Sequence, residues 1–174
     1  MGREITSLGA VRRALSLLVV VVVVAGCGSG KSASTTTAGP PDPAQAAGGG
    51  HTIYQGTEWS VVVKGAQATA LHLVDGRWRP DRSDRVKITF LGPKGTVAPV
   101  FQTAAELSAK EPLVESALWI DGVELLEKGG GLSATRGTIY GAPVAALRRG
   151  RHVAVAYGRT ATSGTAVARV FRVR

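Results

Sequence analysis

Apolar and polar residues alternate along much of the chain beyond residue 52, which is the pattern of half-buried β-strands. The clearest run is Val86-Lys87-Ile88-Thr89-Phe90, which places Val86, Ile88 and Phe90 on one face. Similar runs predict further strands at residues 59–63, 68–74, 99–107, 115–121, 123–126, 138–140, 153–157 and 165–173. The chain beyond residue 52 is therefore predicted to be all-β.

Short turn signals separate these strands. Asp75-Gly76 and Asp121-Gly122 favour two-residue hairpin loops, because both residue types tolerate positive φ. Residues 77–79 are predicted to form a short return strand, and Pro80 blocks its extension. We therefore predict a small β meander at residues 52–85, packed on an antiparallel β-sandwich at residues 86–174.

Four segments of the second half carry a family resemblance. They are Val86-Lys-Ile-Thr-Phe-Leu-Gly-Pro, Leu118-Trp-Ile-Asp-Gly-Val, Leu147-Arg-Arg-Gly-Arg-His-Val-Ala-Val-Ala-Tyr and Ala168-Arg-Val-Phe-Arg-Val. With these segments, residues 86–173 resemble bacterial immunoglobulin-like domains, in which they correspond to strand A, strand C with its turn, strand F and strand G. The resemblance implies an immunoglobulin-like sandwich and no activity, because this fold hosts many functions. The Gly-rich segment 128–141 departs from the family pattern.

The N-terminus has the pattern of an export signal. Arg12 and Arg13 precede the uncharged, mainly apolar run 14–25, which is short for a membrane-spanning helix. The run ends in Val24-Ala25-Gly26-Cys27, which resembles the bacterial lipobox. The resemblance implies that residues 1–26 are a signal peptide and that Cys27 becomes the lipidated N-terminus. Cys27 is the chain's single cysteine, so the sequence excludes an intrachain disulfide.

Residues 27–51 are predicted to be a lipidated cysteine and a disordered linker. The segment is built mainly of Ser, Thr, Ala, Gly and Pro, including Gly48-Gly49-Gly50. Such a composition offers too little apolar surface to offset the entropy of ordering. We therefore expect a tether that holds the β domain away from the extracytoplasmic face of the cell membrane.

Charge is unevenly distributed. The formal net charge is +9, and removal of residues 1–26, with three arginines and one glutamate, leaves +7 (18 basic minus 11 acidic residues). Residues 132–174 hold eight arginines and no acidic residue, whereas residues 106–127 hold six acids and one lysine. These segments are expected to neutralise each other partly across strands C and F. Alternatively, a basic surface faces an anionic membrane or wall polymer. Nucleic acid is not an expected partner of an exported protein.

Few residues suggest chemistry. His51, His72 and His152 have no second ligand at a useful spacing, so no metal site is predicted. No Gly-x-Ser-x-Gly motif is present. The carboxylates of residues 106–127 fit a solvated strand face, and Asp121 fits its turn. We therefore predict no catalytic residue and no cofactor, and we expect that the protein is not an enzyme.

Trp119 is a candidate for a binding face. If Leu118 and Ile120 face the core, Trp119 faces outward, with Ala154 and Ala156 beside it. Such a flat apolar patch could bind a peptide or a sugar ring. Alternatively, the meander covers Trp119 and adds its own tryptophans to the packing.

Arg136 is the second candidate. It belongs to the Gly-rich segment 129–137, whose backbone N–H groups could cradle an anion together with the guanidinium. The alternative is a simple inter-strand loop.

Three functions remain open. The first is a non-catalytic, lipid-anchored envelope module that binds or supports another protein. The second is an accessory module that binds wall or surface polysaccharide, which predicts exposed tryptophans in a groove. The third is an enzyme or a hydrolase accessory, which predicts convergent polar side chains. A protein-binding module predicts an exposed apolar strand edge instead.

Overall fold

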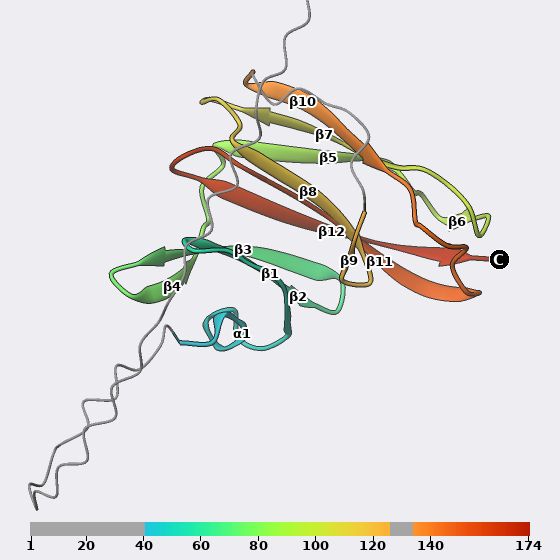
Figure 1. Cartoon of the computed structure of the whole chain (residues 1–174), viewed down its shortest axis with the longest axis horizontal. Coiled ribbons are helices and arrows are strands. Elements are labelled where there is room, and N and C mark those ends of the chain that lie inside the picture. Colours follow the sequence, from blue (N-terminus) through green and yellow to red (C-terminus); the bar gives the residue numbers. More distant parts are fainter. Residues whose placement is uncertain (1–40, 126–133) are drawn as a thin grey trace, which may run out of the picture. The chain divides into compact units, whose positions relative to one another are not determined.

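The computed structural model describes residues 41–125 and 134–174 (Figure 1). Thr37–Arg174 form one compact unit, which contains every hydrophobic cluster given below, so this segment holds the core that it needs to fold alone. The elements of the described residues are α1 (Pro43–Ala46), β1 (His51–Gln55), β2 (Trp59–Lys64), β3 (Gln67–Val74), β4 (Arg77–Pro80), β5 (Val86–Gly92), β6 (Thr96–Val97), β7 (Thr103–Ala109), β8 (Glu115–Ile120), β9 (Val123–Glu124), β10 (Arg136–Gly141), β11 (Gly150–Arg159) and β12 (Gly164–Val173).

Two sheets form a sandwich. The three-stranded sheet has the order β10-β7-β5, and the five-stranded sheet has the order β6-β12-β11-β8-β9. If β5, β7, β8, β10, β11 and β12 are named strands A, B, C, E, F and G, the sheets read ABE and CFG, which is the immunoglobulin arrangement. All pairs are antiparallel except β6 with β12. The predicted all-β, immunoglobulin-like antiparallel sandwich is therefore confirmed.

The core between these sheets follows the alternation seen in the sequence. Val86 and Phe90 of β5 are buried in it, and Leu118 and Ile120 of β8 face them from the five-stranded sheet. Both Asp-Gly turns form as predicted. Asp75 and Gly76 have φ of 51° and 70°, and Asp121 and Gly122 have φ of 51° and 81°.

A third layer covers the other face of the five-stranded sheet. Strands β1, β2, β3 and β4 form an antiparallel meander in that order. Its Trp59 and Val61 pack with Trp119 and Tyr157 of the five-stranded sheet. A Cβ at Gly164 would lie 2.6 Å from the Trp59 ring, so the close approach of the layers requires glycine there. The five-stranded sheet is therefore the middle layer, which packs against the other sheet of the sandwich on one face and against the meander on the other.

The linker prediction is wrong for residues 41–50. The Asp42 side chain caps α1 by accepting a hydrogen bond of 2.9 Å from the backbone N–H of Ala44. The alanines of this segment pack against Val62, Leu71 and Trp78 on the outer face of the meander. Small side chains fill this shallow surface, so the segment is ordered without the large apolar residues that the prediction required.

Candidate functional site

The structure does not unite the predicted site residues. Cys27 lies outside the described residues. Trp119 is 2% exposed and faces the meander from β8. Arg136 is exposed at the start of β10, an edge strand of the three-stranded sheet. The segment 129–137 is described only from residue 134. The exposed binding face predicted around Trp119 therefore does not form, whereas the anion site predicted at Arg136 stays a prediction.

The expected neighbours of Trp119 were also wrong. Its register partner on β11 is Val155, and it packs with Val155 and Tyr157, whereas Ala154 and Ala156 face the sandwich core. Because β11 is buried on both faces, side-chain size does not distinguish them.

The remaining tryptophans are covered as well. Trp59 is buried and stacks on His72 with ring centroids 4.2 Å apart, and Trp78 is buried below α1. The chain has three tryptophans. None of them offers the exposed aromatic platform expected of the polysaccharide hypothesis.

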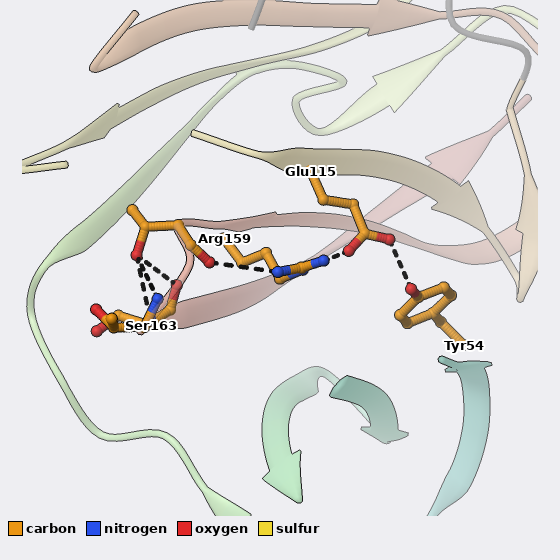
Figure 2. A network of polar contacts seen from close by, with 6 residues as sticks. Tyr54, Glu115, Arg159 and Ser163 are labelled. Carbon is orange, nitrogen blue, oxygen red and sulfur yellow. Dashed lines mark hydrogen bonds and ion pairs between the residues drawn. The ribbon is translucent and has the colours of Figure 1, made fainter. Parts of the chain in front are cut away.

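A polar network crosses from the meander to the middle sheet (Figure 2). The Tyr54 hydroxyl donates a hydrogen bond of 2.6 Å to Glu115 Oε1, and the Nε of Arg159 donates to Glu115 Oε2. Glu115 and Arg159 face each other in the register of β8 and β11. This ion pair confirms part of the expected neutralisation between strands C and F.

The network holds the layers together. Burial, followed by the hydrogen bond to Glu115, raises the pKa of Tyr54 to about 12, so its phenol stays a neutral donor. Both oxygens of the Glu115 carboxylate are engaged by the protein. The groove beside it, of about 470 Å³, includes Glu58 and Trp59 in its lining. Because the Tyr54 phenol and the Glu115 carboxylate are hydrogen-bonded to each other, the arrangement fits a structural link between the layers better than an acid–base site.

A second polar pair fixes the turn after β8. His152 is 9% exposed; its Nδ1 lies 2.6 Å from Asp121 Oδ2, and its Nε2 lies 2.8 Å from the carbonyl oxygen of Arg148. Asp121 Oδ1 also accepts a hydrogen bond from the backbone N–H of Val153. Asp121 therefore does more than form its turn. Only the imidazolium form of His152 can donate to Asp121 Oδ2 and to the Arg148 carbonyl oxygen at once, so the geometry favours the charged ring.

We expect this pair to make stability depend on pH. Burial lowers the pKa of His152, but the hydrogen bonds to Asp121 and to the Arg148 carbonyl and the charge of Asp121 raise it more, so the pKa lies above its ordinary value. The stabilisation is fully present below the unfolded pKa of about 6.5 and is lost as pH rises through the folded value. Urea denaturation at a series of pH values measures this decline.

His152→Gln should flatten that part of the pH profile. The exposed His51 is the matched control, because His51→Gln leaves the Asp121 contact intact. An unchanged slope in His152→Gln, or an equal loss of slope in both variants, would show that His152 does not carry the effect.

A shallow apolar groove of about 280 Å³ lies at the β9 margin of the middle sheet. Val123 of this edge strand is 66% exposed, and Val144 on the facing segment 142–149 is 81% exposed. Leu125 and Leu147 continue the apolar lining down to the sandwich core. This is the exposed apolar strand edge expected of a protein-binding module, and periodicity gave no sign of it.

Residues 41–125 and 134–174 contain no group of three or more His, Cys, Asp or Glu side chains that could hold a metal ion. Within the same ranges, no helix is long and apolar enough to cross a membrane.

Comparisons with known proteins add little. No protein-family model and no curated protein matches the chain. A chain in the crystal structure of the titin M10–obscurin-like 1 Ig complex is similar over 51% of this chain and 95% of that chain, with 16% identity and a TM-score of 0.32. The strand order of the two sheets, β10-β7-β5 and β6-β12-β11-β8-β9, shows the immunoglobulin-like fold without this comparison.

Proposed function

We propose that the chain is an exported bacterial lipoprotein, anchored by a lipid on Cys27 at the extracytoplasmic face of the cell membrane. Its immunoglobulin-like domain is a non-catalytic module that binds a partner protein of the cell envelope. The basic region, apolar run and lipobox pattern support the anchor. The groove at the β9 margin supports the binding role.

The exposed apolar edge carries this proposal. β9 pairs with β8 on one side, and its Val123 is exposed beside Val144. An extended segment of a partner can add to such an edge through main-chain hydrogen bonds and place apolar side chains in the groove. The polysaccharide alternative is disfavoured, because all three tryptophans are buried.

Site-specific crosslinking in the intact envelope tests the groove. A photo-crosslinking side chain at position 144 should give one discrete protein adduct. The same side chain at Val100, which is 72% exposed and does not line the groove, should give at least tenfold less of it. Val123→Asp should reduce the adduct from position 144 at least tenfold, because it places a charge in an apolar contact. Equal adducts from both positions, or no adduct from position 144, would contradict the groove as the binding site.

A further inference from the structure

Arginines gather where β11 begins and β12 ends, near the C-terminus in Figure 1. Arg151 and Arg172 are direct register partners, and both are exposed. Arg149 and Arg174 flank the last pair of the ladder, Gly150 with Val173, and are exposed as well. We call these four arginines the arginine platform.

The platform continues the face of the middle sheet that the meander covers elsewhere. Val153 and Val155 of β11 pack against the meander, and Arg151 is the next residue on that face. On β12, Ala166 and Ala168 pack against the meander, and Arg172 lies further along the same face. On this face, the side chains of Arg151 and Arg172 are thus charged and solvent-exposed, whereas those of Val153 and Val155 are apolar and packed against the meander.

The platform is electrostatically unbalanced. Like charges directly opposite in a ladder destabilise a sheet. The ion pairs among the described residues involve Arg85, His152 and Arg159, and no platform arginine. Asp121, the acid of the neighbouring turn, is bonded to His152 and to the backbone of Val153. Since no acid of residues 41–125 or 134–174 forms an ion pair with the four guanidinium groups, they can bind an external anion.

We propose that the arginine platform docks the domain onto the anionic phospholipid headgroups of the membrane that holds its anchor. Guanidinium groups pair with phosphate through two parallel hydrogen bonds. Each basic residue near an anionic bilayer strengthens binding about fivefold. The inference rests on the proposed anchor, because a lipid on Cys27 would hold the described domain, which begins 14 positions later in the sequence, at the same membrane surface.

Docking through the platform is compatible with a partner in the β9 groove. The sheet order β6-β12-β11-β8-β9 places β9 at one margin, with β8 between it and the platform strands. The groove is also lined by core residues of the sandwich, on the face opposite the meander. A headgroup surface and a partner protein therefore use different faces of the middle sheet.

Vesicle sedimentation with residues 37–174 tests the proposal without the lipid anchor. The segment should bind vesicles of phosphatidylcholine with about 30 mol% phosphatidylglycerol and should not bind vesicles of pure phosphatidylcholine. Binding should weaken as the salt concentration rises, because salt screens the charges. Arg151→Gln with Arg172→Gln should weaken binding about 25-fold, at fivefold per arginine. The matched control is Arg77→Gln with Arg79→Gln on β4, which removes the same charge from exposed positions and should weaken binding less than threefold.

Three outcomes would overturn the proposal. They are no binding to anionic vesicles, equal weakening by both double variants, and binding to soluble polyphosphate without binding to vesicles. The first would show that the platform is inert toward headgroups, the second that only net charge acts, and the third that the ligand is a polyanion in solution. Because the segment lacks Cys27, these results are independent of whether the full chain is lipidated or binds a protein at β9.

Discussion

Trp119→Ala is expected to lower the free energy of unfolding of residues 37–174 by about 3–5 kcal/mol. The indole is buried between the meander and the middle sheet, with ring centroids 6.1 Å from Tyr54 and 6.3 Å from Tyr157. Its removal leaves a cavity in the cluster where Trp59 of the meander meets Val155 and Tyr157 of the middle sheet. Guanidinium denaturation followed by circular dichroism measures the loss.

Val100→Ala is the matched control for this experiment. Val100 is largely exposed, so its truncation should change the free energy of unfolding by less than about 0.5 kcal/mol. If Trp119 formed an exposed binding face, its truncation would spare stability and abolish binding. A loss below about 1 kcal/mol for Trp119→Ala would therefore contradict the three-layer packing.

Cys27→Ala is expected to abolish acylation of the protein completely. The thiol of Cys27 is the chain's single thiol and the proposed attachment point of the lipid. Two acyl chains anchor a protein stably, whereas the run 14–25 is short for a spanning helix. Incorporation of a labelled fatty acid should fall to background, and the electrophoretic mobility should change because processing fails.

Ser29→Ala, two residues further along, is the control for the cysteine variant. It should keep the acyl label, the mobility and the membrane fraction of the wild type. A Cys27→Ala protein that retains the label, or a wild type that never acquires it, is incompatible with the proposed anchor.

The strand pattern was predictable because local signals determine it. Val86, Ile88 and Phe90 alternate with polar residues, and the Asp-Gly turns need only two residues each. The first residue of β7 was not predictable from these local signals. The strand expected at residues 99–107 begins at Thr103, and Val100 is exposed. Apolar character near Val100 and Phe101 gave a strand signal, but pairing with β5 and β10 sets the boundaries of β7.

The candidate sites depend on long-range contacts, which the sequence pattern does not report. Tyr54 and Glu115 are 61 positions apart, and Asp121 and His152 are 31 apart. The β9 groove arises because the segment 142–149 approaches the strand edge from elsewhere in the chain. The concentration of arginines beyond residue 132 was visible, but the pairing of Arg151 with Arg172 required the register of β11 and β12.

The mass of the N-terminal peptide of the wild-type protein, purified from membranes, tests most directly whether this is a lipid-anchored module. The account predicts a peptide that begins at Cys27 and carries a diacylglycerol group on its sulfur. A peptide that begins at Met1, or at any residue other than Cys27, or an unmodified Cys27 in a membrane-bound protein, would contradict it.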